Sequence, residues 1–232
     1  MRTSWLAAPV ALMLLAAASP AEASLVNQIP SCYTASHYRF ASASPRHLLY
    51  VLIDQAGQLS ASLQKSVIDN LNHALGPATK FVIAEFSRTT THHYLRVLYT
   101  GIIESPMTAA ERDNVPVSSL AGFDGCMRGQ AMYAVRMADT TAEHALQTAT
   151  GGADQPNDIL VSLMTVAPVI AQDPAREKVL FLVTDGLENS SFANFTHGIS
   201  DPAQMLQRAR AKGLLANFAG ARVFVLGAGI AP

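Results

Sequence analysis

The chain has 232 residues, of which 50% are hydrophobic and 14% charged, with 16 basic and 17 acidic side chains. This composition is typical of a compact globular protein and excludes a largely disordered chain. The formal net charge is −1, so the chain lacks the excess of positive charge that is typical of proteins that bind nucleic acid or an anionic membrane. We therefore expect neither as a partner.

Residues 1–23 have the three parts of a secretory signal. Arg2 precedes an apolar stretch over residues 5–18, and small residues follow at Ala21 and Ala23. The apolar stretch is shorter than the roughly 20 residues that a membrane-spanning helix needs. We therefore predict a signal peptide over 1–23, no membrane insertion after its removal, and an exported protein, periplasmic or secreted.

The next segment, residues 24–45, is predicted as an N-terminal arm that precedes one domain over 46–232. Cys32 lies in this arm, and Cys126 is the second of two cysteines. An even cysteine count in an exported chain favours a disulfide bond. The alternative is two independent buried thiols, because free cysteine is among the most buried residue types.

The first half of the domain begins with a strand at 48–53, because this run is short, continuous and apolar. An amphipathic helix is predicted over 58–75, where Gly76-Pro77 ends it. Residues 81–86 predict a second strand, and residues 94–99 a more polar strand at the edge of the sheet.

The second half continues the alternation of helices and strands. A loop with two prolines is predicted over 104–124, and Pro168 is expected to kink or shorten the helix that contains it. The remaining elements are predicted as helices over 126–150, 159–170 and 202–215, and strands at 179–184 and 222–226. This order predicts an α/β fold, a three-layer α/β/α sandwich around a doubly wound, mostly parallel sheet with one antiparallel edge strand.

Two aspartates follow the two most apolar strands. Asp54 comes directly after the strand at 48–53, and Asp185 directly after the strand at 179–184. Open α/β sheets bind their ligands in the crevice outside the carboxyl ends of the strands. We therefore expect Asp54 and Asp185 to face one another across such a crevice.

Three segments around these aspartates resemble a known family. LLYVLIDQAGQLS, PNDILVSLMTVA and KVLFLVTDGLENS, in this order, resemble the von Willebrand factor type A (VWA) domain. The resemblance implies a Rossmann-like fold and a metal-ion-dependent adhesion site. In that site the first strand ends in Asp-x-Ser-x-Ser, a threonine precedes the middle helix, and a later strand ends in an aspartate followed by glycine.

Carried over residue by residue, the resemblance places Asp54, Asn157 and Asp185 at the metal site. The two serine positions fall on Ala56 and Gln58, so two hydroxyl ligands are missing. Magnesium prefers six oxygen ligands in octahedral geometry. We therefore interpret the site as degenerate and expect any Mg²⁺ to bind weakly. Further contributors that we consider are Asp158, Gln58 and Ser60.

The loop amides of residues 55–59 and Asn157 are expected to hold the two aspartates in place of a metal. The sequence contains no Gly-x-Ser-x-Gly, His-Glu-x-x-His or phosphate-loop motif. The leading hypothesis is therefore a non-enzymatic binding domain that recognises a protein partner. The alternatives are a metal-assisted hydrolase that uses Asp54 and Asp185, and a scaffold subunit with no ligand in the crevice.

Overall fold

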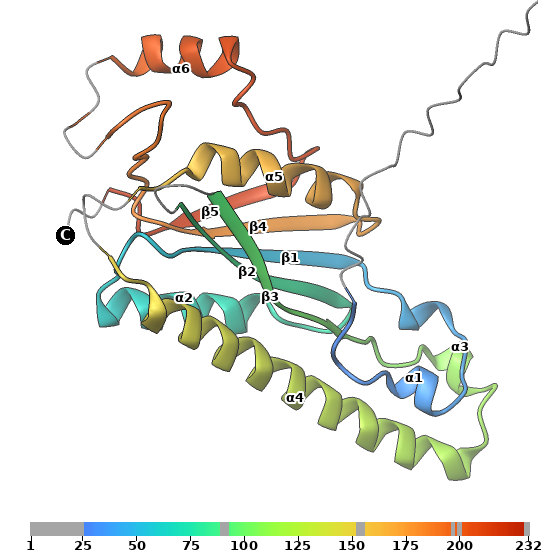
Figure 1. Cartoon of the computed structure of the whole chain (residues 1–232). Helices are drawn as coiled ribbons and strands as arrows, with labels where there is room; N and C mark the ends of the chain where they lie inside the picture. The colour runs from blue at the N-terminus through green and yellow to red at the C-terminus, as the bar shows by residue number, and fades with distance from the viewer. Residues whose placement is uncertain (1–25, 89–92, 152–155, 196–197, 199–200, 230–232) are drawn as a thin grey trace, which may run out of the picture.

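The sheet is the centre of the computed structural model, which describes residues 26–88, 93–151, 156–195, 198 and 201–229. Five strands form one mixed sheet in the order β3-β2-β1-β4-β5 (Figure 1). They are β1 (His47–Asp54), β2 (Thr79–Arg88), β3 (His93–Ile103), β4 (Glu177–Val183) and β5 (Arg222–Leu226).

The strand directions agree with the sequence prediction. β1 pairs in parallel with β2 on one side and with β4 on the other, and β5 pairs in parallel with β4. β3 pairs antiparallel with β2 and lies at the edge of the sheet. The predicted α/β class, with one antiparallel edge strand in a mostly parallel sheet, is therefore confirmed.

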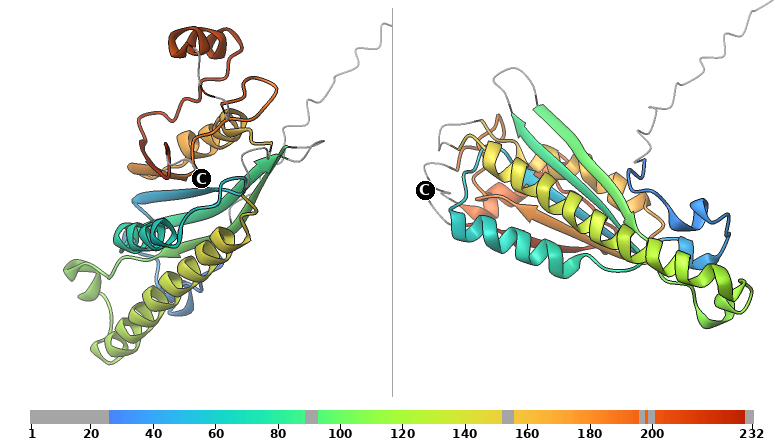
Figure 2. Two further views of the ribbon diagram at one scale, coloured as in Figure 1. Left: turned by 90° about the vertical axis from the view of Figure 1, so that its left-hand side faces the viewer. Right: turned by 90° about the horizontal axis from the view of Figure 1, so that it is seen from below.

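Helices cover both faces of the central strands (Figures 1 and 2). One face carries α2 and α4, and α5 lies on the opposite face. The helices are α1 (Cys32–Ala35), α2 (Ala61–Ala74), α3 (Ala109–Arg112), α4 (Val117–Thr148), α5 (Ile159–Gln172) and α6 (Pro202–Ala211), with a short 3₁₀ turn at Ala41–Ala43. None of the helices in the described part of the chain is long and apolar enough to cross a membrane.

The alternation of side chains along β1 supplies both hydrophobic cores. Leu49, Val51 and Ile53 pack on the side of α2 and α4, whereas Leu48, Tyr50 and Leu52 pack on the side of α5. Successive side chains of a strand point to opposite faces, so a strand that is covered twice must be apolar throughout. This double burial explains the continuous apolar run of β1.

The prediction of a loop over 104–124 is wrong in its second part. Helix α3 begins after a capping box, in which Thr108 and Glu111 satisfy each other's backbone N–H groups. Helix α4 begins at Val117, nine residues before the predicted start, with Pro116 as its N-cap. Proline is tolerated at the start of a helix because the first N–H groups have no partner within the helix. In the sequence alone, this proline indicates a loop equally well.

Three other helices also differ from their predicted bounds. Helix α5 runs past Pro168 to Gln172, so this proline does not shorten it. Helix α2 begins only after Ser60, which is its N-cap, and α6 ends at Ala211, four residues before the predicted end. The α6 end has its cap at Lys212, directly before Gly213, whose φ of +67° is a conformation that glycine adopts readily.

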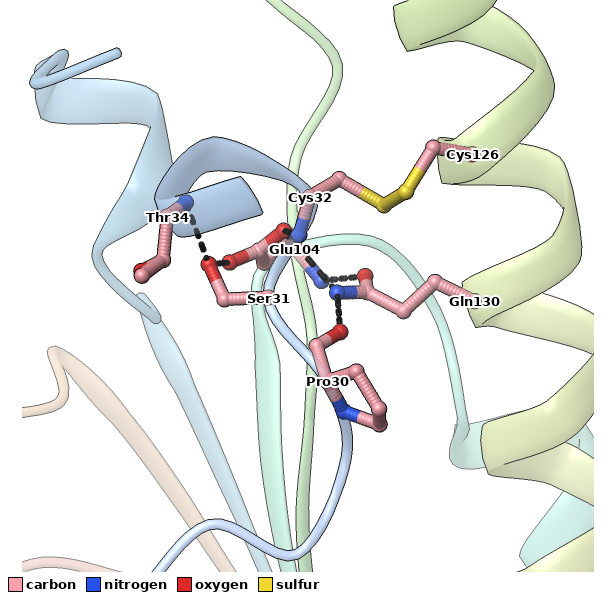
Figure 3. The surroundings of a disulfide bond; sticks show 7 residues. All are labelled: Pro30, Ser31, Cys32, Thr34, Glu104, Cys126 and Gln130. Carbon is pink, nitrogen blue, oxygen red and sulfur yellow. Dashed lines mark hydrogen bonds between the residues drawn. A yellow bond between two sulfur atoms is a disulfide. The ribbon is translucent and has the colours of Figure 1, made fainter. Parts of the chain in front are cut away.

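A disulfide bond joins the N-terminal arm to α4, as predicted. The Cα atoms of Cys32 and Cys126 are 5.9 Å apart. Beside the bond, the buried Glu104 carboxylate accepts hydrogen bonds from the Ser31 hydroxyl, the Cys32 N–H and the Gln130 side-chain amide (Figure 3). The arm is thus held to the fold by a covalent bond and by a polar network, at the end of the sheet where β1 begins.

Candidate functional site

The candidate site lies where the order of the strands reverses direction. From β1 the chain proceeds outward to β2 and β3, then crosses back to place β4 on the other side of β1. At such a switch point the loops that follow the two neighbouring strands diverge and leave a crevice at their carboxyl ends. The loop after β1 and the loop after β4 therefore flank the same position.

Asp54 is almost fully enclosed at this edge, with 3% of its surface exposed. Its Oδ1 accepts a hydrogen bond from the Ala56 N–H at 2.8 Å. Its Oδ2 accepts two more, from Asn157 Nδ2 at 2.6 Å and from Thr184 Oγ1 at 2.7 Å. Three segments that are distant in sequence thus meet at one carboxylate.

The surroundings of Asp54 change its pKa in opposite directions. Burial raises the pKa to about 6, because it removes water from the charged form. The hydrogen bonds from Thr184, Ala56 and Asn157 oppose this shift, and the charge of Asp185 adds to it. The two aspartates are therefore close enough to repel each other.

Asn157 is buried at the same edge of the sheet, with 2% of its surface exposed. It lies just before α5, where its backbone forms a bridge to Asn189 in the loop after β4. Its side-chain nitrogen binds Asp54, but its Oδ1 is buried and has no hydrogen-bond partner in the described structure. A buried amide oxygen without a partner costs free energy and calls for an explanation.

Asp185 lies at the rim and is half-buried. Its Oδ1 accepts a hydrogen bond from the Leu187 N–H at 2.8 Å, so its own loop orients it. Its Oδ2 lies against the loop after β1, since a Cβ added to Gly57 would be 3.2 Å from this oxygen. The structure therefore brings Asp54, Asn157 and Asp185 together at the carboxyl edge of the sheet, between the loops after β1 and β4, and we use the word crevice for this place.

Thr184 is a member of the site that sequence reasoning missed. Its hydroxyl donates to Asp54 and accepts from the Gly186 N–H at 3.0 Å. The hydroxyl therefore links the end of β1 to the turn after β4. The signal was available in the sequence, because Thr184 is the one polar residue in the apolar run before Asp185.

Glu188, in the loop after β4, is a second residue near the site that sequence reasoning missed. Its side chain is buried, with 2% of the residue exposed, and its Oε2 accepts hydrogen bonds from the backbone N–H groups of Ile159 and Leu160. Burial raises the pKa of Glu188, and the hydrogen bond from Ser190 opposes that shift. Glu188 therefore caps the first turn of α5 from another segment, which a reading of its own loop cannot reveal.

The other contributors considered from sequence have different roles here. Asp158 is the N-cap of α5 and accepts from the Val161 N–H, and Ser60 is the N-cap of α2. Gln58 is exposed, with its Cβ packed against the backbone of Gly151. Ala56 offers a backbone N–H to Asp54 but no side-chain oxygen.

In the described residues, no three His, Cys, Asp or Glu side chains gather as a metal centre. The sequence matches no protein-family model, and no curated protein matches it significantly. The resemblance to VWA domains therefore rests on the three motif segments of the sequence.

Proposed function

We propose that this protein is an exported, non-enzymatic binding domain of the VWA type, which recognises a protein partner at the carboxyl edge of its sheet. In this proposal the fold is a three-layer α/β/α sandwich with a doubly wound, Rossmann-like sheet. The helices on both faces of β1 and the parallel pairing of β1 with β2 and β4 support this assignment.

The observation that carries the proposal is the polar cluster at the switch point. Asp54, Asn157 and Thr184 are each at most 3% exposed, in a region where the strands are otherwise apolar. Burying a carboxylate costs free energy even when it is hydrogen-bonded. A strand end with a purely structural role needs no such group, so the cluster is best explained by a ligand that it recognises.

The fit of a divalent cation to this cluster is partial. Carboxylate and amide oxygens are the ligands that Mg²⁺ prefers, and the unpaired Asn157 Oδ1 is one such oxygen. The protons of Ala56, Asn157 and Thr184 already occupy the oxygens of Asp54, however. Asp54, Asn157 and Asp185 would hold the ion, which would supply positive charge to the crevice. We propose that such binding is weak.

The hydrogen bonds to Asp54 also favour a binding role over the metal-assisted hydrolase. A catalytic carboxylate needs an oxygen that can reach the substrate or its attacking water. Both oxygens of Asp54 accept hydrogen bonds from within the protein instead. A scaffold subunit with an empty crevice is the remaining alternative, and it predicts no contact between this edge and any partner.

Export is supported by two independent features. The first is the sequence pattern of a secretory signal at residues 1–23, which lie outside the described residues. The disulfide bond between Cys32 and Cys126 suits an oxidising compartment such as the periplasm or the extracellular space. The partner proposed here is therefore an exported or surface protein.

Site-specific crosslinking in the producing cells tests this proposal. A photoreactive amino acid placed at the exposed Gln58 samples the carboxyl edge, and the same residue at the exposed His73, near the end of α2, serves as the matched control. We expect one discrete crosslinked protein from position 58 and none from position 73. Equal crosslinking from both positions, or none from either, would contradict binding at this edge.

A further inference from the structure

The crevice between β1 and β4 contains hydrogen-bond acceptors and negatively charged groups. Asp54 and Asp185 both contribute carboxylates, and the ion pairs of the described residues involve neither of them. The groups that contact Asp54 are neutral hydrogen-bond donors. Neutral donors satisfy hydrogen bonds but leave the charge of the crevice unbalanced.

Two other acidic residues near the crevice already have partners that compensate their charge. Asp158 and Glu188 accept hydrogen bonds from the first backbone N–H groups of α5. The positive end of the helix dipole offsets these two charges. The unbalanced charge is therefore that of Asp54 and Asp185.

Asn157 provides an independent indication of what the crevice accepts. Its amide lies against Asp54 through Nδ2, and its Oδ1, in the same planar group, is buried without a partner. An acceptor can be satisfied by a proton donor or by a cation. The missing group therefore has N–H or O–H donors or a positive charge.

We infer that the crevice binds a basic side chain, lysine or arginine, inserted by the protein partner. This inference rests on the proposed function and specifies the chemistry of that partner. An ammonium group carries three donors and a guanidinium five, and neither accepts hydrogen bonds, which complements Asn157 Oδ1 and the carboxylate of Asp185. Neither group needs the octahedral set of oxygens that Ala56 and Gln58 fail to complete.

Nuclear magnetic resonance titration of the purified, isotope-labelled protein tests this inference without a known partner. The probes are methylguanidinium, methylammonium and Mg²⁺, each added at constant ionic strength. The readout is the Asn157 side-chain amide together with the backbone amides of 55–59. We expect saturable shifts with methylguanidinium or methylammonium, and the stronger of the two indicates arginine or lysine.

Two variants control for charge and for folding. Asp185→Asn removes one carboxylate of the crevice, and we expect it to weaken binding of the organic cation by about tenfold or more. Asp69→Asn removes an exposed carboxylate of α2 that pairs with Lys65 and has no described hydrogen bond to Asp54, Asn157 or Asp185, and we expect no change. An unchanged amide spectrum away from the crevice shows that each variant is folded.

Saturation by Mg²⁺ alone, no saturable shift with any probe, or equal effects of both variants would each overturn the inference. Its failure is distinguishable from that of the proposed function. If crosslinking still occurs from position 58 but not from position 73, the edge binds a partner through other chemistry. If crosslinking is absent as well, the proposed function is wrong.

Discussion

At the residue scale, the crevice is governed by the balance around Asp54. Burial disfavours its charged form, while Ala56, Asn157 and Thr184 donate protons that stabilise it. The charge of Asp185 adds repulsion to the cost of burial. The site is therefore held in a state in which added positive charge, from a metal or from a partner, would be favourable.

The pH dependence of stability follows from this balance. Burial raises the pKa of Asp54 from its ordinary 3.8 to about 6, so the folded protein binds this proton more tightly than the unfolded chain does. The resulting stabilisation is fully present below the unfolded pKa and is lost as the pH rises through about 6. Its size is on the order of 3 kcal/mol.

Urea unfolding of the native protein and of Asp54→Asn, from about pH 4 to about pH 7, isolates this contribution. We expect the stability of the native protein relative to the variant to fall across this range. A constant or rising difference would show that the pKa of Asp54 is not raised.

The missing hydroxyls define a second prediction at this scale. Replacing Ala56 and Gln58 together with serine restores the Asp-x-Ser-x-Ser pattern of the family. We expect calorimetric titration to show stronger Mg²⁺ binding than in the native protein, because each hydroxyl adds an oxygen ligand. The matched control is Ala203→Ser with Gln204→Ser, at exposed positions of α6. An equal response of both double variants would contradict the role assigned to positions 56 and 58.

At the element scale, the start of α5 is fixed by residues from two segments. Asp158 caps it locally, and Glu188 accepts from the Ile159 and Leu160 N–H groups across the loop after β4. These bonds tie the segment that carries Asn157 to the segment that carries Asp185. The geometry of the crevice therefore depends on this helix start.

Removing the charge of Glu188 tests that dependence. Glu188→Gln keeps the size of the side chain but replaces one oxygen with an NH₂ group that cannot accept hydrogen bonds. We expect the free energy of unfolding to fall by about 1–3 kcal/mol, since buried N–H groups lose a charged acceptor. Chemical denaturation measures this, with Glu143→Gln at an exposed position of α4 as control. Similar losses in both variants would rule out a specific role for Glu188.

The disulfide makes a prediction about the other end of the sheet. Replacing Cys32 and Cys126 with serine removes a cross-link that spans 94 residues. Removal of such a bond typically costs about 2–5 kcal/mol. We expect the hydrogen exchange of the arm and of the first turns of α4 to rise while β1 and β4 stay protected. Increased hydrogen exchange in β1 and β4, with none in the arm, would show that the disulfide does not act mainly on the arm.

The sequence predicts an element correctly where the residues of that element alone show how it is buried. β1 and β4 are covered on both faces, so their apolar runs reveal them directly. The prediction from sequence failed where a contact with a distant segment of the chain decides whether a residue is buried. The burial of Glu188 depends on the start of α5, and nothing in its own loop indicates this. The start of α4 was missed because Pro116 signals a loop and a helix start equally well.

At the scale of the whole molecule, the two ends of the sheet have different roles. The end where β1 begins carries the disulfide and the Glu104 network, which secure the N-terminal arm. The carboxyl edge carries Asp54, Asn157 and Asp185 between loops from two neighbouring strands. In the proposed function, this separation would let a partner contact the crevice without disturbing the arm.

The most direct test of binding at this edge is the affinity of the partner captured from position 58. Once that protein is purified, it is titrated calorimetrically against the native chain, Asp185→Ala and Asp69→Ala. We expect Asp185→Ala to weaken binding by about tenfold or more, and Asp69→Ala to leave it unchanged. Equal affinities for all three proteins would contradict the assignment of the binding site to the crevice between β1 and β4.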